Sequence, residues 1–292
     1  MSYIGRFAPS PTGPLHAGSL VAALASYLDA RAHQGRWLIR IEDIDETRTV
    51  TGAAEDIIHT LAALGMQSDE TIFWQSQRKS RYEAAFFELK NKVYPCACSR
   101  KEITDSRVSL SSDGAAIYPG TCRTGLAEGR SARTWRLRVP NTGDTLDEIE
   151  FNDRWQGPVR ESLSASVGDF VLRRADGFWA YQLAVVIDDA DQEITHVVRG
   201  ADLLESTARQ IYLQRLLNKK TPDYLHVPVI TNDRGEKLSK QTGAQALDTS
   251  QPVSTLLAAA KALELDITAE AISSVQTFYD AAVPAWARRF GD

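Results

Sequence analysis

Between residues 3 and 93 the chain alternates short apolar runs with segments of helical periodicity, and this alternation constrains the fold more than any other feature. Strands that alternate with helices build a parallel sheet with crossover helices, so the sequence predicts an α/β protein. In such a sheet, ligands bind at the carboxyl ends of the strands. We expect strands at residues 3–8, 36–41 and 73–74, and helices at residues 19–32, 53–64 and 80–93.

The loop after the first expected strand is stiff, because Pro9, Pro11 and Pro14 each fix φ and remove a backbone donor. The helix that follows points its N-terminus back at this loop. Free N–H groups and partial positive charge at a helix N-terminus suit an anion such as phosphate. On this stretch alone, a rigid connection with one chance histidine, His16, explains the residues as well as a phosphate site does.

The alternation stops at Tyr94, where we expect a loop-rich insertion between two halves of the sheet domain. Beyond the insertion we expect a hairpin made by residues 169–174 and 178–187. Further strands are expected at 134–139, 148–151, 195–198 and 226–230, and further helices at 204–217, 252–263, 268–279 and 282–289. The predicted segments are 1–94 and 166–247 for the two halves, 95–165 for the insertion and 248–292 for a short helical tail.

Charge and composition argue against several classes of protein. A net charge of −5 does not favour a broad electrostatic grip on nucleic acid, although it is compatible with a local basic face. The N-terminus lacks a signal-peptide pattern, and the longest apolar stretch, residues 20–28, is too short to span a bilayer. Three cysteines are an odd number, which is poor for a disulfide framework. We therefore expect a reduced, cytoplasmic protein with no membrane partner.

A second candidate for phosphate chemistry lies far along the chain, where Lys237 and Lys240 stand three residues apart. A mobile ammonium can neutralise charge that develops on a phosphoryl group. A lone lysine pair is usually a solvated surface loop, but its combination with the motif at residues 16–19 favours a phosphate site. The sequence has no G-x-x-x-x-G-K-[ST] and no strand-following G-x-G-x-x-G, so neither a P-loop kinase nor a dinucleotide dehydrogenase fits.

Four ordered motifs together resemble the class I aminoacyl-tRNA synthetases. Residues 16–19 (HAGS) resemble the HIGH signature of that family, and residues 237–241 (KLSKQ) resemble its KMSKS loop. Residues 40–45 (RIEDID) and 198–204 (VRGADLL) resemble the glutamyl branch in particular. The resemblance covers roughly residues 3–247 and implies a Rossmann-type parallel-sheet catalytic domain with a zinc-binding insertion and a short C-terminal helical appendage.

The resemblance implies ATP-dependent activation of L-glutamate, with Mg²⁺ carried by the nucleotide. Ser19 and Gln241 depart from the name-giving motifs, at places where glutamyl-type enzymes vary. Catalysis of adenylate formation is mainly positioning and charge stabilisation. The implied catalytic residues are His16 and Lys240, and the implied ATP-binding residues are His16, Gly18, Ser19, Lys237 and Lys240.

A glutamate substrate needs cations for its side-chain carboxylate and a carboxylate for its ammonium group. Arginine binds a carboxylate bidentately. By resemblance, the amino acid is bound by Arg6, Ser10, Glu42, Tyr181 and Arg199, with Glu42 at the amino group and Arg6 at the γ-carboxylate. Without the resemblance, Glu42 would be interpreted as a helix-capping or surface carboxylate and Arg199 as part of a structural ion pair.

Cys96, Cys98 and Cys122 suggest a metal, because zinc favours thiolate ligands in tetrahedral sites. Three packed or exposed thiols are the alternative. No histidine lies between residues 60 and 195, so the fourth ligand must be another residue type. Tyr118 matches the glutamyl-family pattern of a tyrosine ligand four residues before the last cysteine, and a nearby Zn²⁺ can drive loss of the phenol proton. We expect one structural zinc ion.

Length and one substitution distinguish members of the family. Few residues follow Lys240, whereas a full glutamyl-tRNA synthetase continues into a large anticodon-binding region. Val185 stands where the discriminating enzymes tend to have asparagine. Both features resemble the truncated paralogue family that attaches glutamate to queuosine in the anticodon loop of tRNA(Asp). We expect a monomer that activates glutamate without tRNA. The alternatives are an ordinary glutamyl-tRNA synthetase that charges a 3′ end, an enzyme that joins glutamate to something other than RNA, and an inactive RNA-binding paralogue.

Overall fold

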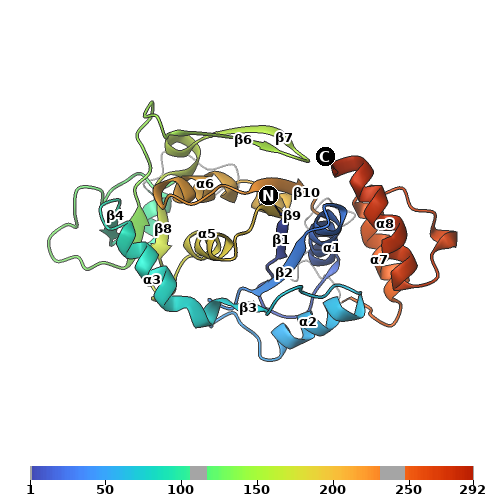
Figure 1. The fold of residues 1–292 in the computed structure, drawn as a ribbon. Helices are drawn as coiled ribbons and strands as arrows, with labels where there is room; N and C mark the ends of the chain where they lie inside the picture. Colours follow the sequence, from blue (N-terminus) through green and yellow to red (C-terminus); the bar gives the residue numbers. More distant parts are fainter. Residues whose placement is uncertain (1, 106–116, 231–246, 292) are drawn as a thin grey trace.

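The protein is described by a computed structural model over residues 2–105, 117–230 and 247–291. At its centre is a sheet with the strand order β3-β2-β1-β9-β10-β6-β7 (Figure 1). The strands are β1 (Ile4–Phe7), β2 (Arg36–Ile41), β3 (Phe73–Trp74), β6 (Glu148–Asp153), β7 (Gly157–Ser162), β9 (His196–Gly200) and β10 (Asp223–Val227). Neighbouring strands are parallel except β6 and β7, which form an antiparallel hairpin. The parallel sheet confirms the predicted fold class.

Helices cover both faces of this sheet, so the apolar core consists of two clusters, one on each face. One cluster includes α1 (Ala17–Ala32), α2 (Ala53–Ala63), α7 (Pro252–Ala262) and α8 (Val275–Phe290), and the other includes α3 (Lys79–Glu88), α5 (Tyr181–Asp191) and α6 (Ser206–Leu216). Strand β2 contributes side chains to both clusters, because successive side chains of a strand point to opposite faces. Trp37 and Ile39 belong to the first cluster and Leu38 to the second. No helix within the described ranges has the length and apolar character needed to cross a membrane.

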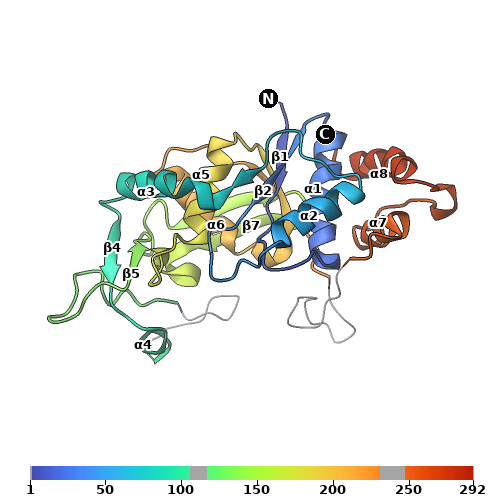
Figure 2. The same ribbon diagram turned by 90° about the horizontal axis from the view of Figure 1, so that it is seen from below.

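A second, smaller sheet lies beside α3 and is antiparallel, with the order β4-β5-β8. Its strands are β4 (Val93–Cys96), β5 (Thr134–Leu137) and β8 (Phe170–Arg173), and the short helix α4 (Arg100–Asp105) follows β4. This sheet lies at the opposite end of the molecule from α7 and α8 (Figure 2). Strand β4 crosses the predicted boundary at residue 94, and β6 and β7 belong to the main sheet. The division of the chain into four segments stays a prediction.

The prediction that residues 178–187 form the second strand of a hairpin is wrong. Most of this segment is the start of helix α5, and β8 has only an isolated bridge to Trp179. The misassignment has a physical reason. All side chains from residue 183 to residue 189 are buried, so the apolar run carries no periodicity that separates a helix from a strand.

The tail also differs from expectation, because residues 275–290 form one helix, α8, that contains Pro284. Separate helices were expected at residues 268–279 and 282–289, and a proline inside a helix removes one of its hydrogen bonds. Packing holds the helix together across it: Phe278 and Trp286 are both fully buried. The Trp286 indole donates a hydrogen bond of 2.8 Å to buried Asp29 on α1. Similarly, the helix expected over residues 80–93 ends at Glu88.

Candidate active site

Two adjoining cavities open at the carboxyl ends of β1, β2 and β9. The first has a volume of about 410 Å³ and lies among the loop after β1, the start of α1 and the end of β9. The second has a volume of about 290 Å³ and includes Glu42. Both are lined by Ala8, Ser10, Thr12, Tyr181 and Leu203. The first cavity brings together the predicted site residues Arg6, Ser10, His16, Gly18, Ser19, Tyr181 and Arg199.

The loop after β1 is braced by the loop after β2. The backbone N–H of Glu42 donates to the carbonyl of Pro9 at 2.9 Å, and the N–H of Val50 donates to the carbonyl of Pro11 at 2.9 Å. Gly13 has a φ of 132°, which a side chain would disfavour. Prolines fix φ in the same loop, so the chain between the two cavities has little conformational freedom.

His16 is the N-cap of helix α1. Its Nδ1 accepts a hydrogen bond of 3.3 Å from the backbone N–H of Ser19, and its Nε2 lies 3.2 Å from the Ser19 hydroxyl oxygen. With Nδ1 as the acceptor, the proton of a neutral imidazole resides on Nε2. The Nε2–H of His16 therefore faces the Ser19 hydroxyl oxygen, at the N-terminus of α1 and inside the first cavity.

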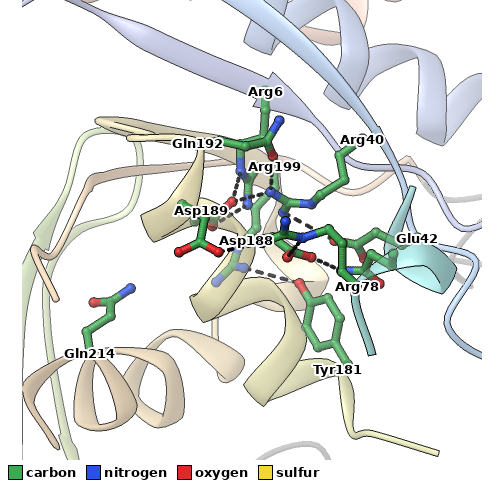
Figure 3. A network of polar contacts seen from close by, with 12 residues as sticks. Arg6, Arg40, Glu42, Arg78, Tyr181, Asp188, Asp189, Gln192, Arg199 and Gln214 are labelled. Carbon is green, nitrogen blue, oxygen red and sulfur yellow. Dashed lines mark hydrogen bonds and ion pairs between the residues drawn. The ribbon is translucent and has the colours of Figure 1, made fainter. Parts of the chain in front are cut away.

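Arg6 belongs to a buried ionic cluster (Figure 3). Its Nε and Nη2 donate to the two carboxylate oxygens of Asp189 at 3.0 and 3.2 Å. Arg40 also lies against Asp189, at 2.8 Å, and donates to Glu42 at 3.3 Å. Burial raises the pKa of Asp189, but the guanidinium groups of Arg6 and Arg40 outweigh it and hold that pKa below its usual value. Asp189 thus fixes Arg6 as a charged group beside the cavity.

Glu42 is buried, and its pKa departs from the usual value. Burial raises its pKa from 4.5 to about 7, and the opposing effects of Arg40 and Arg6 only partly offset the rise. A carboxyl group with this pKa is about half ionised at neutral pH. A substrate ammonium beside it would favour the ionised form.

Arg199 is held by a chain of buried polar groups. Its Nε donates to Nε2 of His226 at 2.9 Å, and Nδ1 of His226 lies 2.6 Å from the Asp153 carboxylate. Burial is the main reason that the pKa of His226 lies below its usual value. The ring is therefore neutral, with its proton on Nδ1 toward Asp153. The Nη1 of Arg199 donates to the Tyr181 hydroxyl at 3.4 Å (Figure 3), and both residues line the first cavity.

Some of these partners were not singled out from the sequence. Four such residues come from four different elements, and only the fold brings them beside the site residues: Arg40, Asp153, Asp189 and His226. For Asp189 a signal exists, because two aspartates end a long apolar run. Lys237 and Lys240, predicted to bind ATP, lie outside the described residues.

The predicted metal ligands come together at the small sheet. One ligand atom from each of Cys96, Cys98 and Cys122 lies within 4.8 Å of the others. The hydroxyl oxygen of Tyr118 lies 3.4 Å from the sulfur of Cys96 and 3.7 Å from that of Cys98. Three thiols and one phenol at this spacing fit a tetrahedral zinc site. Burial raises the pKa of the Tyr118 phenol, so only a bound cation would make it a good anionic ligand.

Comparison with known proteins agrees with this geometry. The family model described as the catalytic domain of class I tRNA synthetases (E and Q) matches residues 4–255. The glutamyl-Q tRNA(Asp) synthetase of Janthinobacterium sp. (strain Marseille) is 65% identical over 288 residues, covering 99% of this chain and 98% of that protein. The protein of the same name from Verminephrobacter eiseniae (strain EF01-2) is 61% identical over 288 residues, with the same coverage.

A solved structure extends the comparison to the fold. The glutamate-tRNA synthetase from Elizabethkingia anophelis superposes with a TM-score of 0.70 at 30% sequence identity, covering 83% of this chain. The match covers 53% of that structure, so this chain spans about half its length. The chain belongs to the class I aminoacyl-tRNA synthetases of the E and Q type and, within them, to the glutamyl-Q tRNA(Asp) synthetase family.

Proposed function

We propose that this chain activates L-glutamate with ATP, without tRNA, and then transfers the glutamyl group to the queuosine base at the wobble position of tRNA(Asp). The observation that carries the proposal is the set of opposite charges around the joined cavities. Arg6 and Arg199 supply cations on one side, and Glu42 supplies a carboxyl group on the other. The curated relatives that match nearly the whole chain are named for this activity.

In this proposal glutamate lies across the wall that the two cavities share. Arg6 uses Nε and Nη2 for Asp189, and its Nη1 is left to bind the γ-carboxylate. Glu42 receives the α-ammonium group and becomes fully ionised as it does so. Tyr181 and Ser10 line both cavities and supply hydroxyl groups to the amino acid between them.

The first chemical step joins glutamate to the nucleotide. An oxygen of the α-carboxylate attacks the α-phosphorus of ATP, the bond from that phosphorus to the bridging oxygen breaks, and pyrophosphate leaves with the electron pair. His16, the backbone N–H of Gly18 and the side chain of Ser19 would hold phosphate oxygens at the start of α1. Mg²⁺ carried by the nucleotide would offset phosphate charge. Lys237 and Lys240 stay predicted partners of the same phosphates.

The second step consumes the adenylate. A hydroxyl oxygen of the modified base attacks the glutamyl carbonyl carbon, the bond to the phosphate oxygen breaks, and AMP leaves as the hydroxyl proton passes to water. This step requires an unstacked base to enter beside Glu42, and RNA loops supply such bases. Aromatic Trp179 lines the same cavity and offers a stacking surface.

The metal centre has a structural role in this proposal. Cys96 is the last residue of β4 and Cys98 follows shortly after it. Cys122 lies further along the chain, in the connection between β4 and β5. A zinc ion bound by these thiolates and Tyr118 would tie that segment to the small sheet. The cytoplasmic location and the monomeric state stay predictions.

Pyrophosphate exchange tests the first step directly. We expect glutamate-dependent exchange between ATP and labelled pyrophosphate in the absence of RNA. Lys240→Ala should slow exchange while leaving the unfolding temperature unchanged, because the lysine acts on phosphate charge. Absence of exchange at saturating glutamate, with and without tRNA, would refute the enzyme proposal. Exchange that requires tRNA would favour an ordinary synthetase.

A further inference from the structure

A third cavity, of about 930 Å³, lies between α4, the small sheet and the loops that follow β2 and β8. We call it the basic groove. Six of its lining side chains are cationic and one, Asp176, is anionic; the cations are Arg48, Arg100, Lys101, Arg133, Arg136 and Arg174. This concentration of positive charge contrasts with the net charge of −5 for the whole chain. A local excess of this kind marks a binding site for an anion larger than one phosphate.

The basic groove is continuous with the candidate active site. Arg48 and Arg174 line both the groove and the Glu42 cavity. Both arginines contact the carboxylate of Asp45, at 2.7 and 2.6 Å. Arg174 is also paired with Asp176 at 2.6 Å, so the two arginines at the junction are balanced by two carboxylates. A chain-like ligand can therefore pass from the groove to the wall beside Glu42 along side chains that line both cavities.

Half of the groove's cations are available to a ligand. Arg100, Lys101 and Arg133 are exposed, and among the described residues none of the three has an ion-pair partner. The carboxylate nearest to them in sequence, Glu102, is paired with Arg130 at 2.7 Å. Figure 2 shows α4 beneath β4 and β5, at the end of the molecule that is remote from the C-terminal helices.

One of the remaining cations, Arg136, is part of the wall of the groove. Arg136 is buried, lies 4.0 Å from the ring centre of Tyr118, and donates to the backbone carbonyl of Asp169 at 2.7 Å. Cys98 also lines the groove, so its wall includes the metal-ligand cluster. The groove therefore has a buried wall that includes Arg136 and a rim of exposed cations that a ligand can reach.

We propose that the basic groove binds the backbone phosphates of the RNA acceptor, on nucleotides that flank the base placed beside Glu42. The inference rests on the proposed function, which requires an RNA loop to present one base at this cavity. The spacing of phosphates along a strand suits a row of cations, and Arg and Lys contacts to phosphate carry no base specificity. An acidic peptide is the alternative ligand for such a groove. RNA is favoured because the groove ends at the cavity where the acceptor must react.

The test removes the three exposed cations together, as Arg100→Gln, Lys101→Gln and Arg133→Gln in one chain. Binding of an anticodon stem-loop that carries queuosine is measured by fluorescence anisotropy from low to high salt. Each lost phosphate contact lowers the slope of log K against log salt by ~0.7, so the slope should fall by about 2. The KM for the stem-loop should rise at least ~10-fold at moderate salt. RNA-free pyrophosphate exchange should be unchanged, because none of the three residues lines the other two cavities.

A matched control removes three exposed cations outside the groove: Arg215→Gln, Lys261→Gln and Arg288→Gln. It should bind the stem-loop like wild type. The proposal is overturned if the groove variant keeps the wild-type salt slope and KM, if the control loses as much, or if a polyglutamate peptide displaces a bound probe and the stem-loop does not. Failure of the proposed function shows separately, as absence of pyrophosphate exchange in the wild-type protein.

Discussion

The neutral His226 ring is predicted to set the affinity for glutamate by orienting Arg199. The replacement Asp153→Asn tests this without changing the size of the side chain. In wild type, His226 Nδ1 faces the Asp153 carboxylate at 2.6 Å and Nε2 accepts from Arg199. An asparagine amide N–H toward Nδ1 would move the ring proton to Nε2. Two donors, the Nε2–H and the Arg199 Nε–H, would then face each other across 2.9 Å.

The magnitude follows from the lost hydrogen bond. A buried hydrogen bond from a charged donor contributes ~1.5–3 kcal/mol. Since ~1.4 kcal/mol is a factor of ten, the KM for glutamate in pyrophosphate exchange should rise ~10- to 150-fold. The KM for ATP should change little, because Arg199 is assigned to the amino acid. His226→Gln can return an acceptor oxygen near the Nε2 position and should recover most of the affinity.

Two comparisons separate orientation from general damage. His226→Leu removes the acceptor and should resemble Asp153→Asn in its KM for glutamate, whereas His226→Gln should not. Thermal unfolding followed by circular dichroism checks that all three variants are folded. If the folded Asp153→Asn protein keeps the wild-type KM for glutamate, or if His226→Gln is as impaired as His226→Leu, the orienting role of His226 is refuted.

Further predictions concern the other described groups. Because burial holds the pKa of Glu42 near 7, the KM for glutamate should fall as pH rises from 6 to 8, and Glu42→Gln should remove that dependence. Because the pKa is raised on folding, the Glu42 carboxyl stabilises the folded state below pH 4.5. This stabilisation, about 3 kcal/mol in the free energy of unfolding, is lost as the pH rises through 7. The purified chain should contain one zinc by elemental analysis, and Cys122→Ser should lose the zinc and lower the unfolding temperature while keeping pyrophosphate exchange. A metal-free wild-type protein of unchanged stability would contradict the zinc assignment.

Local sequence predicts those parts of the site that consist of residues adjacent in the chain. The loop from Pro9 to His16 and the start of α1 lie in one cavity as expected, because prolines and a helix N-terminus determine local geometry. Arg6 and Glu42 end neighbouring parallel strands, so the fold class alone brings them to the same edge. The cysteine spacing similarly predicted a cluster that the structure brings together.

The sequence alone does not predict which residues contact Arg6, Glu42 and Arg199 and set their orientation or pKa. Asp189 lies near the end of α5, and the first part of that helix falls in the strand expected at residues 178–187. Asp153 and His226 lie on β6 and β10, which pair through a register that no local pattern encodes. The pKa of Glu42 depends on its burial and on the charges of Arg40, Arg6 and Asp189, which only the assembled fold brings to it.

The central claim is that glutamate is transferred to queuosine in an anticodon loop. The most direct measurement incubates the protein with ATP, labelled glutamate and two isolated stem-loops of tRNA(Asp), one with queuosine and one with unmodified guanosine at the wobble position. Label should appear only on the queuosine stem-loop, in an ester that mild alkali releases. Label on the 3′ terminal ribose of an unmodified full-length tRNA, with none on the queuosine stem-loop, would contradict the claim and identify an ordinary glutamyl-tRNA synthetase.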